Sequence, residues 1–179
     1  MKEAHVSVVD LIISEVENRW ATGESSRWQL KPEALFWFEQ ESGLTALYVL
    51  WHRAASEQPV PRKNDFDPIK ALSVYDSAEC GVIRVKGRAG REFHRRDTVY
   101  LSFEAAHQNA YERECLECDL QSVLMNPGAS YHHVDQVIDG KAERYSRLLL
   151  PVTDGGGEIV EVMVAENREI ASIAVRLDQ

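Results

Sequence analysis

Hydrophobic and polar positions follow two different periods along this chain, and the change falls close to residue 128. In the N-terminal part, apolar residues recur every three to four positions, which is typical of amphipathic helices. Such stripes cover residues 9–20, 44–55 and 103–125. A further helix is expected from Pro32, because proline is favoured at the first helical position. Asn126-Pro127-Gly128 ends the last stripe.

Beyond residue 128 the pattern changes to the alternation that strands with one buried face show. Turns such as Asp139-Gly140 and 154–157 separate these segments, and strands joined by tight turns run antiparallel. The segments expected to be strands in this part are 130–138, 142–152 and 158–165, and 80–86 is expected to be an earlier strand. The stretches 87–102 and 166–179 do not decide between helix, strand and loop.

Helices followed by an antiparallel meander predict an α+β fold in which helices cover one face of a sheet. The expected organisation has three parts. They are an N-terminal helical extension over residues 1–43, one α+β domain over 44–165, and a C-terminal tail over 166–179.

The apolar stripe of the N-terminal helix contains Ile12, Val16 and Trp20. It either docks on the body of its own chain or forms the seam of a homodimer. Both alternatives require residues 9–20 to be helical.

Composition and charge narrow the choice of partner. The net charge of −9 opposes binding to nucleic acid, because neutralising phosphates requires clustered lysine and arginine. The apolar runs are too short for a membrane span, and the N-terminus lacks the pattern of a secretion signal. Three cysteines are too few for a disulfide framework. These features predict a cytoplasmic protein.

Several motifs of the chain resemble the PAS domains, and within them a bacterial, mainly alphaproteobacterial, group of stand-alone PAS-like proteins. The likeness covers residues 44–165, and its most specific element is Arg147 to Gly156, with a Leu-Leu-Leu-Pro stretch before an Asp/Gly turn. The other motifs are the helix ending in Trp51, the loop from Pro61-Arg62 to Phe66-Asp67-Pro68, and the helix closing at Asn126-Pro127-Gly128. The resemblance implies a five-stranded antiparallel sheet with a helical flank. It also implies sensing or protein contact in signal transduction without catalysis.

Four residues of two neighbouring predicted strands are candidates for ligand binding. Tyr131, His133, Tyr145 and Arg147 alternate along these strands, and a shared face would give aromatic walls with polar tips, as small-molecule pockets often have. The alternative is that they form the outer face of the sheet, where aromatic and arginine contacts are common.

A different function is suggested by Cys115 and Cys118, which have the spacing of half a zinc site. With a histidine such as His107, His132 or His133, they would make a zinc-binding or metal-stabilised enzyme. Neighbouring carboxylates oppose thiolate formation, so two cysteines on a helix with no metal are the simpler interpretation. The sequence does not name a cofactor. It predicts a sensory or regulatory module that binds a small ligand or a signalling protein and is not an enzyme.

Overall fold

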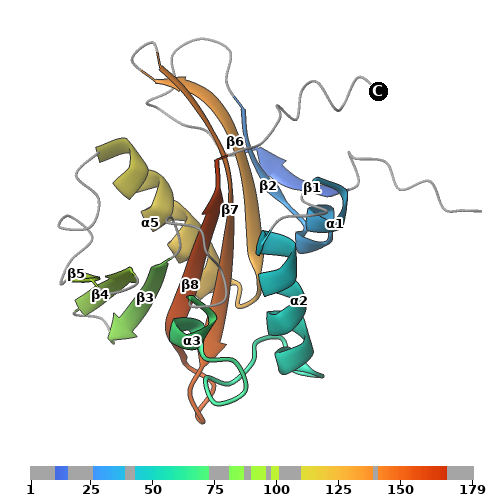
Figure 1. The fold of residues 1–179 in the computed structure, drawn as a ribbon, viewed down its shortest axis with the longest axis vertical. Coiled ribbons are helices and arrows are strands. Elements are labelled where there is room, and N and C mark those ends of the chain that lie inside the picture. Colours follow the sequence, from blue (N-terminus) through green and yellow to red (C-terminus); the bar gives the residue numbers. More distant parts are fainter. Residues whose placement is uncertain are drawn as a thin grey trace, which may run out of the picture.

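The computed structural model describes residues 11–15, 26–38, 43–72, 81–86, 90–95, 98–100, 110–138 and 141–168. These residues form an α+β structure around one twisted sheet (Figure 1). Its strands are β1 (Ile12–Glu15), β2 (Ser26–Leu30), β3 (Gly81–Lys86), β4 (Gly90–Arg95), β5 (Thr98–Tyr100), β6 (Ser130–Ile138), β7 (Lys141–Thr153) and β8 (Ile159–Asn167). Its helices are the 3-10 turn η2 (Pro32–Ala34) and the α-helices α1 (Leu35–Phe38), α2 (Gly43–Ala55), α3 (Pro68–Leu72) and α5 (Ala110–Met125).

The described strands pair in the order β1-β2-β6-β7-β8-β3-β4-β5, and all neighbouring strands are antiparallel. The meander of β6, β7 and β8 confirms the strands predicted beyond residue 128. The sheet then grows on both sides with strands from earlier in the chain, since β3 joins β8 and β2 joins β6. The candidate residues therefore lie near the centre of the sheet.

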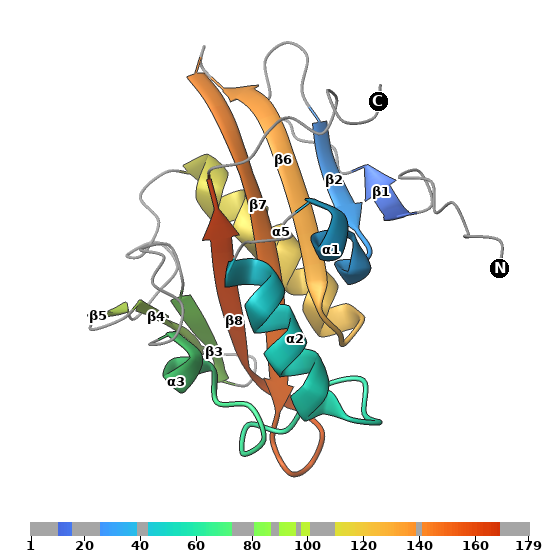
Figure 2. The same ribbon diagram turned by 45° about the vertical axis from the view of Figure 1, so that its right-hand side comes forward.

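Helices lie on both faces of this sheet, whereas the sequence predicted helices on one face only. Figure 2 shows α2 in front of the central strands and α5 behind them. Leu116, Leu120 and Val123 of α5 pack in one core cluster with Leu149 and Val162. The other face forms a second cluster with α2, which includes Leu44, Leu47, Trp51, Tyr131, Leu148, Leu150 and Met163. Each central strand is thus covered twice, which accounts for the buried run Leu148-Leu149-Leu150.

Helix α2 and the loop that follows it contact the sheet at several points. The indole Nε1 of Trp51 donates to the carbonyl oxygen of Pro151 over 2.7 Å. Lys63 and Thr153 are joined through the backbone, with Lys63 N donating to Thr153 O over 2.9 Å. The Lys63 ammonium also lies 2.6 Å from the carboxylate of Glu161. These contacts hold α2 in a fixed position over β7 and β8.

The prediction for the N-terminal part is wrong where the structure describes it. Ile12–Glu15 forms the edge strand β1, because Leu11 and the residues after it find hydrogen-bonding partners along β2. Ile12 packs against the core of its own chain, so the proposed helical dimer seam does not form at this position. Val16 and Trp20 lie outside the described residues, as does the stretch 169–179.

The structure confirms two helical predictions for the middle of the chain. Residues 44–55 and the end of the long helix at Met125 are confirmed by α2 and α5, while 103–109 lie outside the described residues. No helix in the part of the chain that the structure describes is both long enough and apolar enough to cross a membrane.

Candidate functional site

The register of β6 and β7 separates the four predicted ligand-binding residues into two pairs. In this register Tyr131 faces Leu148 and His133 faces Ser146, while His132 faces Arg147 and Val134 faces Tyr145. Because side chains alternate between the two faces of a sheet, Tyr131 and His133 lie on the face that α2 covers, and Tyr145 and Arg147 lie on the face that α5 covers. The expected shared face does not exist. A ligand-binding role for any of the four stays a prediction.

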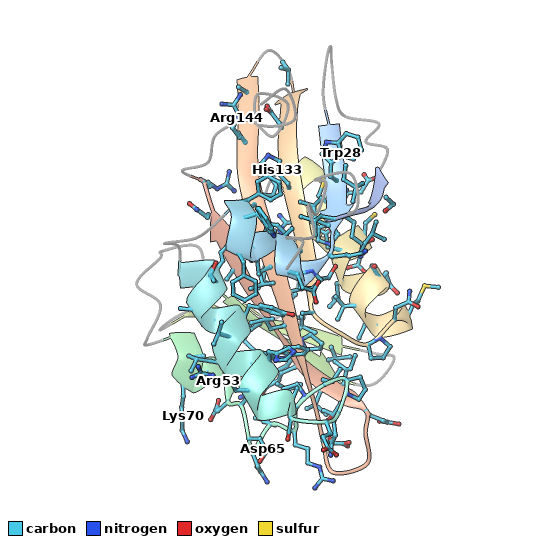
Figure 3. All side chains as sticks on the ribbon, turned by 90° about the vertical axis from the view of Figure 1, so that its right-hand side faces the viewer. Trp28, Arg53, Asp65, Lys70, His133 and Arg144 are labelled. Atoms are coloured by element: carbon cyan, nitrogen blue, oxygen red, sulfur yellow. The ribbon has the colours of Figure 1, made fainter. Side chains whose placement is uncertain are left out.

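All four residues are buried, with exposed fractions of 2% or less. They therefore do not form the solvent-exposed outer face that was the alternative. Tyr131 belongs to the core cluster under α2. His133 lies opposite Trp28 of β2 on the same face, and Figure 3 labels both residues toward one end of the long axis.

The α5 face holds a buried network of charged residues centred on Asp119. Arg147 donates from Nη1 to Oδ2 of Asp119 over 2.6 Å, and Arg27 of β2 donates to Oδ1 of the same carboxylate. Arg27 also donates to the backbone carbonyl of Cys115 over 3.0 Å. The network joins α5 to β2 and β7, which are far apart in the sequence.

Arg147 also pairs with a second carboxylate, that of Glu166. The Nε of Arg147 donates to Oε1 of Glu166 over 2.7 Å, and Nη2 of Arg168 lies 3.2 Å from the other oxygen of Glu166, Oε2. The guanidinium groups of Arg147 and Arg168 both lie over the Tyr145 ring, 5.0 Å and 5.2 Å from its centroid. Two buried arginines thus meet two carboxylates, so the desolvated charges are compensated by partners in direct contact.

Burial and these charges set the protonation of the network. Burial raises the pKa of the Asp119 carboxyl, but His132, Arg147 and Arg27 together outweigh it, and the resulting pKa lies below its ordinary value. Burial lowers the pKa of His132 from 6.5 to about 4, and the two arginines act in the same direction against Asp119. Burial likewise raises the pKa of Tyr145 to about 12. At neutral pH the carboxylate is therefore ionised and the imidazole and phenol are neutral.

One chain of contacts resembles the order of nucleophile, base and acid in the catalytic triad of hydrolases. It runs from Ser130 through His132 to Asp119. Ser130 Oγ is 2.8 Å from Nε2 of His132, and Nδ1 of His132 is 3.3 Å from Oδ1 of Asp119. The Ser130 hydroxyl also accepts a hydrogen bond from Gln29 over 3.2 Å, and the residue is only 5% exposed. Asp119 is held by two arginines, which depress the basicity of the imidazole. This chain of contacts links buried polar groups and does not present an accessible nucleophile.

The cysteine pair on α5 is divided between interior and surface. Cys115 is buried, Cys118 is exposed, and both are free thiols. Among the residues that the structure describes, no three histidine, cysteine or acidic side chains lie where they could hold a metal ion together. His107 lies outside these residues. The described part of the chain gives the zinc hypothesis no ligand set, and the hypothesis stays untested.

A groove on the outer side of α2 is a different kind of site, which sequence reasoning missed. It has a volume of about 220 Å³ and is lined by Glu33, Phe36, Tyr48, Val49, His52 and Arg53. The Phe36 and Tyr48 rings meet edge to face at 6.0 Å, and the His52 ring lies 5.7 Å from that of Tyr48. Phe36 remains 46% exposed. Figure 2 shows α1 beside one end of α2, and the groove is lined by residues of η2, α1 and α2.

Burial raises the pKa of the Tyr48 hydroxyl, and the nearby Glu33 carboxylate acts in the same direction. The groove thus combines the aromatic rings of Phe36 and Tyr48 with the acidic Glu33 and the basic side chains of His52 and Arg53. The sequence signal was the consecutive aromatic residues Phe36, Trp37 and Phe38, of which Trp37 is 55% exposed.

Comparison of the chain with family models, with curated proteins and with solved structures gives no match.

Proposed function

We propose that this chain is a PAS-like regulatory module of the cytoplasm that binds a partner and does not turn over a substrate. The resemblance of residues 44–165 to the PAS domains suggests the class. An antiparallel sheet with α5 packed on one face supports this class, and the segment contributes six described strands, β3 to β8, where the resemblance implies five.

One observation carries the proposal: the polar residues inside the sheet bind one another, while the aromatic groove on α2 is open. Arg147, Asp119 and Glu166 form their ion pairs internally, so a ligand between sheet and α5 would first have to break buried, compensated contacts. The groove requires no such change. A protein partner at the surface is therefore favoured over a small ligand enclosed in the core.

The test uses the full-length purified protein. Native mass spectrometry would look for a retained ligand, and thermal-shift measurements would follow binding of metabolites and candidate partner proteins. We expect stabilisation by a binding partner, following the mass-action relation between ligand concentration and stability, with the partner chemically unchanged. Multiple turnover of any metabolite would overturn the proposal.

A further inference from the structure

The groove on α2 has charged groups on both sides of its aromatic floor. Glu33 lies near the Tyr48 hydroxyl, whereas Arg53 is five residues beyond Tyr48 along α2. At a rise of 1.5 Å per residue, Tyr48 and Arg53 are separated by about 7.5 Å along the helix axis. The acid thus comes from η2, whereas the base comes from the last turns of α2.

Neither charged group is neutralised by an ion pair within the described part of the chain. Glu33 and Arg53 lack such a partner, whereas other surface charges, such as Asp135 with Arg144, are paired. Glu33, His52 and Arg53 are all exposed, so a binding partner reaches them without rearrangement of the fold. These groups are available to recognise opposite charges on a partner.

The size of the groove suits one bulky side chain. Pockets that enclose a whole drug-sized ligand usually measure about 300 to 1,000 Å³, and this groove has about 220 Å³ and is open to solvent. In an extended peptide, residues two positions apart are separated by about 6.6 Å, which is comparable with the rise of about 7.5 Å along the helix axis between Tyr48 and Arg53. The net charge of −9 also favours approach of a partner with positive charge.

We propose that the groove binds an extended segment of a basic partner protein, which inserts an apolar side chain against Phe36 and Tyr48. A basic residue on one side of this anchor meets Glu33, and an acidic residue on the other side meets Arg53. This inference rests on the proposed binding function and assigns it a site and a recognition pattern.

Selection of heptapeptides from a random phage library on the full-length protein tests the pattern. We expect enriched peptides with the order basic, apolar, acidic. The double variant Glu33→Lys/Arg53→Glu should enrich the reverse order, acidic, apolar, basic, because both charged groups of the groove have changed sign. A matched control, Glu57→Lys/Arg62→Glu, makes the same changes at exposed positions outside the groove and should select the wild-type order.

Binding of one enriched peptide, labelled with fluorescein, then gives the size of the effect. Each single change, Glu33→Gln or Arg53→Gln, should weaken binding about two- to fivefold, as expected for exposed ion pairs. Val49→Asp should weaken it at least about tenfold, because a charge replaces apolar surface in the groove. Thermal unfolding of every variant would check that the fold is unchanged.

Absence of any enriched peptide, or the same order selected by wild type and by the charge-swapped variant, would overturn the inference. A partner that still stabilises the wild type and the charge-swapped variant equally would leave the regulatory function standing and place its site elsewhere. If the wild type neither enriches a peptide nor is stabilised by any partner, the result would count against the proposed function as well.

Discussion

Asp119 of α5 and Arg147 of β7 form a buried ion pair, with Arg147 Nη1 2.6 Å from Asp119 Oδ2 and both side chains 2% exposed. The pair fixes the position of a helix on a sheet through two charges that would each be costly alone. Removing one partner of such a pair is much more damaging than removing a contact at the surface.

Replacing the central carboxylate should therefore destabilise the protein strongly. Asp119→Asn removes the carboxylate that Arg27 pairs with and leaves Arg147 with Glu166 as its acidic partner, and we expect a loss of about 3 to 5 kcal/mol in the free energy of unfolding. Urea denaturation would measure it. Asp135→Asn removes the exposed pair with Arg144, which the view of Figure 3 labels at one end of the molecule, and should cost below about 1 kcal/mol. Equal losses for the two variants would show that the network does not stabilise the fold.

The buried imidazole of His132 should make stability fall in mild acid. Its pKa is about 4 in the folded chain against 6.5 in the unfolded chain. Between these values the unfolded state binds a proton that the folded state does not, so stability decreases as pH falls from about 6.5 to about 4. The difference corresponds to roughly 3 kcal/mol, and it should appear in urea midpoints measured between pH 7.5 and 4.5.

His132→Gln should reduce this pH dependence, while the exposed His52→Gln should retain it. Asp119 acts in a different window, because its lowered pKa means that its contribution is lost only below about pH 4. A wild-type profile that is flat from pH 6.5 to 4.5 would contradict a neutral, buried His132.

The hydrogen bond between Trp51 and Pro151 should contribute to the attachment of α2. Trp51→Phe deletes the indole donor to the Pro151 carbonyl and leaves a small cavity among buried side chains. The expected cost is about 2 to 4 kcal/mol, measured by urea denaturation with an unchanged dependence on urea concentration. Trp37→Phe is the matched control, since Trp37 is 55% exposed and should change stability by less than about 0.5 kcal/mol.

The two cysteines of α5 should differ in reactivity. Cys118 is exposed and Cys115 is 2% exposed, so a thiol reagent applied to the native protein should label Cys118 first. Peptide mass spectrometry would locate the label, and both residues should react at similar rates in urea. Rapid labelling of Cys115 in the native protein would mean that α5 separates readily from the sheet.

The hairpins and α2 were predictable because their signals are local. Alternation on both sides of the turn signal Asp139-Gly140 predicts β6 and β7, and the stripe around Leu47 and Trp51 predicts α2. The second helical layer was missed because the run Leu148-Leu149-Leu150 was interpreted only as strand, although continuous apolar residues indicate burial on both faces.

The predicted ligand-binding residues of β6 and β7 do not share a face, and the spacing of the two strands in the sequence already implies this. Ile138 lies opposite Lys141, so every odd-numbered residue of β6 faces an even-numbered residue of β7. Tyr131 and Tyr145 therefore cannot share a face. The contacts of Arg27 with α5 and the groove between α1 and α2 depend on how distant segments pack, and no local pattern encodes them.

The pairing of β2 with β6 also has a consequence for the newly synthesised chain. Arg27 precedes Asp119 by 92 residues, and during translation at about 5 to 20 residues per second it leaves the ribosome roughly 5 to 18 s before its carboxylate. Strand β2 cannot form its contacts with α5 and β6 until those later elements have been synthesised. Contacts of such long range give a high contact order, so we expect this protein to fold slowly, on the millisecond to second scale.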